Sequence, residues 1–303
     1  MKRFKTISEF HQFRQLPPPE HPLISVSEFN VARQAEAVSE TWCYDFYAIG
    51  LKRVSFSDKI NFKYGQQPFD FNEGILSFVA PNQVLSLTID APLEVKQAGW
   101  LLLIHPDFLW NTPLAKSIKK YDFWDYAVHE SLFLSAKEEE TIVHIARNLQ
   151  QECSLNIDQF TKSIIISHLE TLLNYADRFY HRQFITREKA NYEILQRVES
   201  LLNDYFNRAD LIEKGIPTVA HIAESLNLSP KYLSALLKVL TGQNTQQHIH
   251  QKLIEKAKEK LSTTNLTVSE IAYTLGFEHV QSFSKLFKTK TQQSPVEFRA
   301  AFN

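Results

Sequence analysis

The segment TVSEIAYTLGFEHVQSFSKLFK, residues 267–288, has a second version at residues 218–238, TVAHIAESLNLSPKYLSALLK. Each version starts with threonine, has an isoleucine–alanine pair four residues later, and has a leucine three residues after that pair. The later version carries one additional residue in its centre, beyond which the two apolar patterns coincide again. Agreement at so many positions indicates an internal duplication.

Each copy predicts two helices joined by a tight turn. Thr267 and Glu270 form a capping box, and Thr218 supplies the same hydroxyl cap in the first copy. Gly276 occupies the second turn, where a positive φ is expected, and Asn227 takes that place in the first. The second helix of each copy has apolar residues at helical spacing, so the pattern is that of a helix-turn-helix. These inward-facing residues are Leu233, Leu236, Leu237 and Leu240, and then Phe283, Leu286 and Phe287.

The outer face of each second helix carries small, polar and basic side chains. Small side chains let a helix approach the floor of the major groove, and lysine and glutamine reach phosphates and base edges. A solvated helix face is the alternative, but two copies with the same polar register favour contact with duplex DNA. The predicted DNA-binding residues are Lys231, Tyr232, Ser234, Ala235 and Lys238 in the first copy, and Val280, Gln281, Ser284, Lys285 and Lys288 in the second.

Residues 245–261 separate the two copies and have apolar side chains at helical spacing. A helix of that length is roughly 25 Å long. Together with the width of the flanking helices, it would place the two reading helices about 34 Å apart, which is one turn of B-DNA. Residues 217–303 hold ten Lys and Arg against six Glu, a net charge of +4; since the whole chain has −1, the remainder sums to −5. The sign of the charge therefore places a phosphate-binding surface in the C-terminal part.

The N-terminal region reads as short strands bounded by Gly, Pro, Asn or Asp, which predicts an antiparallel sandwich or barrel. The predicted strands cover residues 44–54, 59–64, 75–79, 84–89 and 99–104. Aromatic residues on and beside these strands are interpreted mainly as core, with a minority lining a ligand cavity. They are Trp42, Tyr44, Phe46, Tyr47, Phe62, Tyr64 and Phe78.

Helices follow the strands. Ser135 and Glu138 form a capping box before an apolar helical period, and a second helix is predicted over residues 158–181. This second helix has apolar residues on two faces, which indicates either two packing partners, one of them a second subunit, or one wide core face. Leu172 and Leu173 are the residues predicted to face a partner subunit.

The segment 182–194 is polar and has no apolar period, so we place the domain boundary there. The predicted domains are residues 1–185, a sensor and dimerisation domain, and residues 190–303, a DNA-binding domain.

The C-terminal hundred residues resemble the DNA-binding domain of the AraC/XylS family of bacterial transcription regulators. The resemblance rests on TGQNTQQHIHQKLIEKAKEKL, TVSEIAYTLGFEHVQSFSKLFK and SPVEFR. It implies an all-α domain with two helix-turn-helix units joined by a connecting helix, and a sequence-specific DNA-binding regulator, either an activator or a repressor. The chain departs from the family pattern at Gln292, where glycine is usual, and a left-handed conformation is expected there.

By its domain order, the N-terminal part is similar to the family's cupin-like antiparallel β-barrel with a helical dimerisation pair. The resemblance therefore implies an α+β multidomain protein of the cytoplasm. Its implied partners are double-stranded DNA, a second copy of the chain, a small-molecule effector and, for an activator, RNA polymerase. An N-terminal domain that binds no small molecule and only dimerises or contacts another protein is the alternative.

The sequence offers little for catalysis. The strand region has only His105, with His21 and His129 far from it along the chain, whereas cupin enzymes cluster histidines around a metal. His248 and His250 are two residues apart and so do not share a helix face. Phosphate-binding glycine motifs and HExxH are absent, and so is an apolar run long enough to cross a membrane. We expect no catalytic residue, no cofactor and no metal; the alternative is a cupin-type enzyme or sugar-binding protein with a DNA-binding tether.

Overall fold

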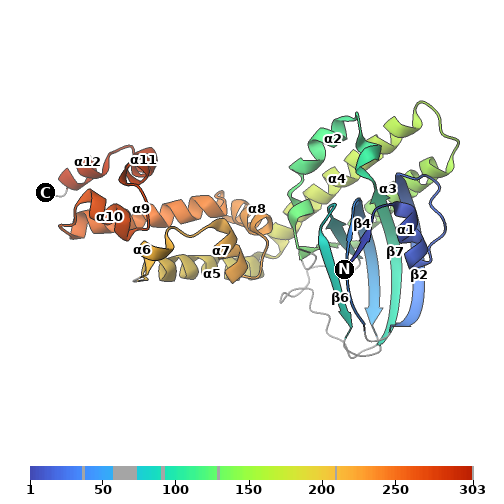
Figure 1. The fold of residues 1–303 in the computed structure, drawn as a ribbon, viewed down its shortest axis with the longest axis horizontal. Coiled ribbons are helices and arrows are strands. Elements are labelled where there is room, and N and C mark those ends of the chain that lie inside the picture. The colour runs from blue at the N-terminus through green and yellow to red at the C-terminus, as the bar shows by residue number, and fades with distance from the viewer. Residues whose placement is uncertain (36–37, 57–73, 90–92, 128–129, 209, 302–303) are drawn as a thin grey trace. The chain divides into compact units, whose positions relative to one another are not determined.

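The computed structural model describes residues 1–35, 38–56, 74–89, 93–127, 130–208 and 210–301. The chain divides into two compact units, Met1–Arg187 and Glu188–Asn303 (Figure 1). The N-terminal unit combines strands with helices, and the described part of the C-terminal unit is entirely helical. Each described helix is too short or too polar to cross a bilayer.

The strands of the N-terminal unit form two sheets, one of three strands in the order β1-β3-β6 and one of five in the order β2-β7-β4-β5-β8. The described pairs are antiparallel except for β1 with β3, so the prediction of a wholly antiparallel arrangement is wrong there. Within the described residues the two sheets do not close into a barrel. The strands are β1 Lys2–Phe4, β2 Ile24–Ala35, β3 Val38–Tyr44, β4 Tyr47–Phe56, β5 Gly74–Val79, β6 Val84–Ile89, β7 Leu93–Ile104 and β8 Leu132–Leu134.

Four of the predicted strands correspond to observed ones. Residues 44–54, 75–79, 84–89 and 99–104 match β4, β5, β6 and β7, and the predicted strand 59–64 lies outside the described residues. Both strands of the pair β2 and β7 are twelve residues long and run side by side from Ile24–Ile104 to Ala35–Leu93. This long antiparallel ladder forms one side of the five-stranded sheet.

The main apolar cluster joins the two sheets and the first helix. Trp42 and Tyr44 on β3 contribute from the small sheet, while Ala48 and Leu103 contribute from the large one. Helix α1 (Ile7–Arg14) adds Phe10, whose ring packs edge-on against that of Tyr44 with 5.3 Å between the ring centroids. Of the aromatic residues considered for a pocket, those in this cluster are therefore core, and Phe62 and Tyr64 lie outside the described residues.

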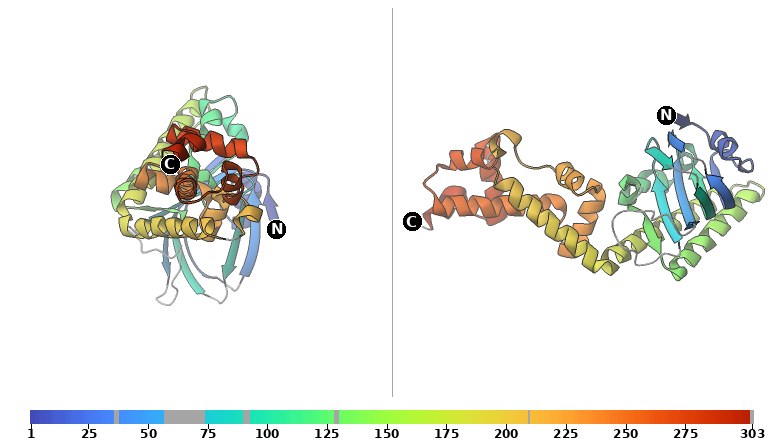
Figure 2. Two further views of the ribbon diagram at one scale, coloured as in Figure 1. Left: turned by 90° about the vertical axis from the view of Figure 1, so that its left-hand side faces the viewer. Right: turned by 90° about the horizontal axis from the view of Figure 1, so that it is seen from below.

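The two long helices of the N-terminal unit, α3 and α4, follow the last strand in the chain and pack against the five-stranded sheet (Figure 2). Ser135 and Glu138 form the predicted capping box at the start of α3 (Ala136–Ser154). The remaining elements are η1 Pro106–Leu109, α2 Pro113–Ser117, η2 Ile118–Lys120, η3 Asp122–Asp125 and α4 Thr161–Thr186.

Helix α4 has one wide core face. Leu172 and Leu173 are only 2% and 1% exposed, so the prediction that they face a partner subunit is wrong. Ile165 and Ile166 are buried as well, and only Ile164 of that apolar triplet is exposed. The two apolar faces read from the sequence therefore belong to one broad contact with α3 and the sheet.

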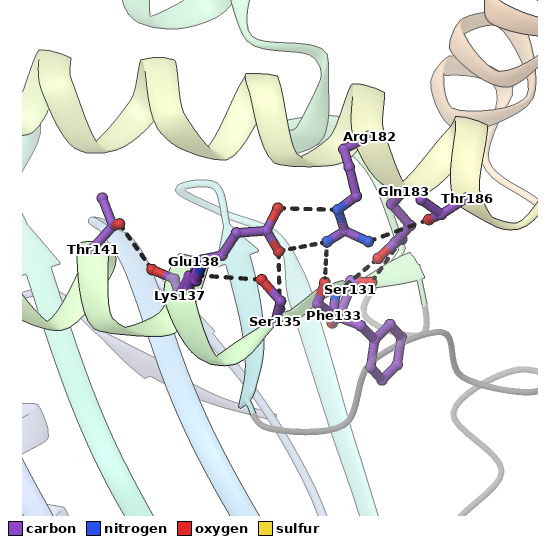
Figure 3. Close-up of polar contacts among 9 residues, drawn as sticks. All are labelled: Ser131, Phe133, Ser135, Lys137, Glu138, Thr141, Arg182, Gln183 and Thr186. Atoms are coloured by element: carbon purple, nitrogen blue, oxygen red, sulfur yellow. Dashed lines mark hydrogen bonds and ion pairs between the residues drawn. The ribbon is translucent and has the colours of Figure 1, made fainter.

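A polar network fastens the end of α4 to β8 and to the start of α3 (Figure 3). The Arg182 guanidinium donates to both carboxylate oxygens of Glu138, at 3.0 and 2.9 Å, and to the carbonyl oxygen of Phe133 at 2.6 Å. The neighbouring Gln183 is fully buried; its amide accepts from the Phe133 N–H at 2.8 Å and donates to the Ser131 carbonyl at 3.3 Å. These two side chains thus make hydrogen bonds to the β8 backbone that a neighbouring strand would otherwise make.

The division between the two units, after Arg187, lies inside the segment 182–194 where we place the boundary, but the chain is helical on both sides of it. Helix α4 continues to Thr186, and α5 (Glu188–Phe206) begins after Arg187. Gln183 and Asn191 are fully buried, so polar composition conceals core positions in this segment.

The C-terminal unit is built around helix α9 (Thr245–Thr263), which packs against α5, α8, α10 and α12. Its core residues have no exposed surface: Leu233, Leu236, Leu237, Ile249, Leu253, Ala257, Phe283 and Phe287. The other helices are α6 Leu211–Lys214, α7 Val219–Ser225, α8 Pro230–Thr241, α10 Val268–Thr274, α11 Val280–Thr291 and α12 Pro295–Ala300.

We predict that Arg182→Lys lowers the free energy of unfolding of the N-terminal unit by about 1–2 kcal/mol, because an ammonium cannot bridge both Glu138 oxygens and the Phe133 carbonyl together. Urea denaturation measures the change. Arg178→Lys, on an exposed part of the same helix, is the control and should change stability by less than about 0.5 kcal/mol. Equal midpoints for the two variants would contradict the role given to the network.

Candidate nucleic-acid interface

The two helix-turn-helix units, α7–α8 and α10–α11, share the same backbone turn. Asn227 and Gly276 have φ values of 56° and 83°, as the sequence predicts. In each unit the residue after this position donates its N–H to the carbonyl of the alanine at the helix crossing, which closes the turn. These bonds run from Leu228 to Ala223 (2.9 Å) and from Phe277 to Ala272 (3.0 Å).

The second helices of the two units have the same length of twelve residues and end in the same way. Gly242 and Gln292 cap α8 and α11 in the left-handed conformation, with φ of 76° and 63°. Their N–H groups donate to the carbonyl oxygens of Lys238 and Lys288, both at 2.9 Å. The expected left-handed geometry at Gln292 is confirmed, at a cost of about 1 kcal/mol relative to glycine.

The duplication extends beyond the reading helices into the helices that follow them. Asn244 and Gln247 form a complete capping box at the start of α9. Ser294 and Glu297 form the same box at the start of α12, at the equivalent position. The repeat therefore consists of three helices, although the third is long in the first copy and short in the second.

Helix α11 presents the polar face that the sequence predicts. Gln281, Lys285 and Lys288 are exposed, while Val280 and Ser284 are half-buried between them. Gln281 and Lys285 are four residues apart, so they occupy neighbouring positions on one face. The arrangement gives one amide and two ammonium groups along a single helix surface.

Helix α8 presents a sparser face. Lys231 and Lys238 are exposed near its two ends, and Ala235 is half-buried between them. The Ser234 hydroxyl is half-buried and lies 3.1 Å from the Thr245 hydroxyl at the start of α9, so it already has a partner within the protein. The long side chains of this face are thus confined to its ends.

Tyr232 was predicted on the outer face of α8, and this prediction is wrong, because the residue is only 4% exposed. It lies four residues before Leu236, which is fully buried, and so shares the inner side of the helix. The equivalent position in α11 is Ser282, which is exposed. The alignment of the two copies already indicated this difference, since a large aromatic residue in the first copy aligns with a small polar residue in the second.

The sequence also places Lys290 beyond this face, but sequence reasoning left out His279 and Thr289, two exposed residues near the ends of α11. His279 is its N-terminal cap residue, is exposed and makes no side-chain capping bond. Thr289 and Lys290 are exposed at the other end. Burial, together with the charge of Lys290, lowers the pKa of His250 on α9.

The described residues include no group of three His, Cys, Asp or Glu side chains placed to hold a metal ion. The His248 ring bonds to the Thr241 hydroxyl at 2.8 Å and the His250 ring to Gln246 at 2.9 Å, so the two histidines have separate partners. The ring of His105 accepts from the Asp107 N–H at 3.3 Å, and His129 lies outside the described residues.

Comparison with known proteins matches residues 222–301 to a helix-turn-helix domain family. The uncharacterised HTH-type transcriptional regulator YfiF of Bacillus subtilis is 27% identical over 146 residues, which are 48% of this chain and 43% of that protein. The arabinose operon regulatory protein of Escherichia coli is 35% identical over 82 residues, 27% of this chain and 28% of that protein.

Among solved structures, the C-terminal domain of the two-component response regulator yesN from Fusobacterium nucleatum is 35% identical and has a TM-score of 0.28. The match covers 33% of this chain and 96% of that one. The chain spans less than half the length of the two curated relatives.

We predict that Gln281→Ala relaxes base preference at one defined position of the bound DNA and leaves non-specific affinity nearly unchanged. Its amide can pair with an adenine edge, a contact that contributes roughly 1–3 kcal/mol of discrimination. Selection from random duplexes measures the preference at each position. Gln251→Ala, an exposed glutamine on α9, is the control and should return the wild-type motif. If Gln281→Ala returns that motif too, specificity comes from DNA shape instead.

Proposed function

We propose that this chain, whose residues 222–301 form an AraC-type helix-turn-helix domain, is a sequence-specific DNA-binding transcription regulator. The observation that carries the proposal is the pair of units with the same turn, the same caps and a polar outer face on each second helix. A single solvated helix face needs no explanation, whereas two equivalent faces on one rigid support suit two successive major-groove windows.

The two reading helices divide the work in this proposal. Helix α11 reads bases, because Gln281 and Lys285 lie together on its exposed face and have the reach for base edges. Helix α8 mainly positions the protein, because its long exposed side chains, Lys231 and Lys238, lie near the helix ends where phosphates pass. Ser282 and His279 add polar groups at the start of α11.

The proposal for the N-terminal unit is coarser. Two sheets with an apolar cluster between them and a flanking helix pair are compatible with a cupin-like sensor domain that binds a small-molecule effector or dimerises. A regulator of this kind works in the cytoplasm and, if it activates, contacts RNA polymerase. The two relatives are named as regulators, which favours this function over a cupin-type enzyme with a DNA tether.

Dimerisation, if it occurs through the helix pair, needs a surface other than Leu172 and Leu173. The turn between α3 and α4 exposes Leu155, Ile157 and Phe160, the last at 58% of its surface. The Lys162 ammonium, at the start of α4, donates to the backbone carbonyl oxygen of Trp110 at 2.8 Å, and the Trp110 side chain is exposed as well. We assign the homodimer contact to this turn patch, Trp110, Leu155, Ile157 and Phe160.

We predict that the segment Glu188–Asn303 folds and binds duplex DNA as a monomer, with an affinity that falls steeply as salt rises. Each lysine–phosphate contact releases counterions, so log K falls linearly with log salt. Lys238→Ala and Lys288→Ala should each weaken binding to all DNA sequences alike. Each should also lower the slope of log K against log salt by about 1. Fluorescence anisotropy at several salt concentrations measures both effects. Salt-independent binding would contradict the mechanism.

We predict that Phe160→Glu converts a full-length dimer into monomers, because a charge replaces an exposed apolar ring at the centre of the turn patch. Sedimentation velocity measures the change in mass. His144→Glu, an exposed position on α3, is the matched control and should remain dimeric. A dimer that persists in Phe160→Glu, or a wild-type chain that is monomeric at high concentration, would contradict the assignment.

A further inference from the structure

The turn of the second helix-turn-helix unit contacts the segment that precedes the first unit, and the contact is between glycine backbones. A Cβ atom built on Gly276, in the turn of the second unit, would lie 2.8 Å from the carbonyl carbon of Gly215 and 3.0 Å from its Cα. It would also lie 3.1 Å from the nitrogen of Ile216. All three neighbours are backbone atoms, which cannot rotate away as a side chain can. Only glycine therefore allows the turn of the second unit to approach this closely.

Gly215 is held from the side of the first unit. It ends α6 with a φ of 72°, and its N–H donates to the Leu211 carbonyl at 2.9 Å. Its own carbonyl accepts from the Tyr205 hydroxyl at 3.1 Å. The Tyr205 ring, on α5, lies 5.4 Å from that of His221 on α7, the first helix of the first unit. Gly215 is thus anchored to α5 and α6 immediately before the first unit starts.

The contact is narrow, because side chains do not fill the space beside it. A cleft of about 310 Å³ lies between the α5–α6 segment and helices α9 and α10. It is bordered by Leu211 and Ile212 on one side and by Lys256, Lys260 and Thr274 on the other. Since a cleft borders the joint, the backbone contact of the two glycines sets the smallest separation that the segments can reach there.

Helix α9 packs against α8 of the first unit and α10 of the second, and so sets the distance between the two units. Helix α9 supplies the first connection between the reading helices, and the contact between Gly215 and Gly276 supplies a second, away from the α9 axis. Two connections restrain rotation as well as distance. Inserting one base pair between two half-sites rotates the second by roughly 34° and so requires this rotation.

We propose that Gly276 and Gly215 are positioning residues that set the spacing between the two DNA half-sites that the protein accepts. The inference rests on the proposed DNA-binding function and adds the element that fixes the geometry of binding. Neither glycine touches DNA in this account; both act through the relative orientation of α8 and α11.

The chain contains a matched control for the left-handed conformation. Gly242 has a φ of 76°, close to the 83° of Gly276, but a Cβ built on it meets nothing within 4 Å. Gly242→Ala and Gly276→Ala therefore carry the same backbone penalty, and only the second forces the two units apart. Tyr205→Phe is a milder variant, since it removes one hydrogen bond to Gly215 and adds no atom.

The test uses the full-length chain and duplexes carrying two half-sites, taken from selection with the wild type, at spacings from two base pairs shorter to two longer. For the wild type we expect one base pair of insertion to lower affinity about 100-fold, because the second unit can no longer engage. Gly242→Ala should keep this dependence. In Gly276→Ala the same insertion should lower the affinity for the duplex less than about tenfold, and the affinity for a single half-site should be unchanged.

Two results would overturn the inference. One is that Gly276→Ala, shown by circular dichroism to be folded, keeps the spacing dependence of the wild type. If Gly276→Ala does not fold, an unchanged spacing dependence in Tyr205→Phe would overturn the inference instead. The other is wild-type protein that binds these duplexes equally at every spacing. Failure of the wild type to bind any duplex would overturn the proposed function as well, which separates the two hypotheses.

Discussion

Asn227 and Gly276 hold the backbone at positive φ, and the chain then reverses within one turn so that two helices cross at an alanine. This crossing decides which side of each second helix packs into the core and which side is exposed. Leu233, Leu236 and Leu237 of α8 are fully buried, as are Phe283 and Phe287 of α11. The polar row is exposed as a consequence, so the reading surface follows from the geometry of the turn rather than from any preference of lysine or glutamine.

The repeated part of the chain could be predicted closely from the sequence because its signals are local. A cap, a turn residue and an apolar row act within a few residues, and each appears twice, so the second occurrence checks the first. The error at Tyr232 has a physical reason: a residue at the edge of a helix face becomes buried or exposed according to what packs beside it. The contact between Gly215 and Gly276 could not be predicted, since the two residues are far apart in the sequence and no local pattern indicates that they meet.

The N-terminal unit was harder to predict because its decisive contacts are polar and distant in sequence. Arg182 and Gln183 look like loop residues, yet they supply the hydrogen bonds that hold α4 to β8 and to the start of α3. The parallel pairing of β1 with β3 likewise depends on a three-residue strand at the start of the chain, too short to show a period. Composition identifies the strands of such a unit more readily than it identifies how they pair.

The cap of α11 makes the two reading units unequal in their resistance to local opening. Gln292 holds a left-handed backbone that glycine adopts freely in the equivalent cap of α8. Its amide group donates to the Thr289 carbonyl at 3.3 Å, which offsets part of the strain. Fraying at the end of α11 consequently costs less than fraying at the end of α8. The end of α8 is thus held more firmly than the end of α11, and in the proposed function α11 is the helix that carries the base-reading residues.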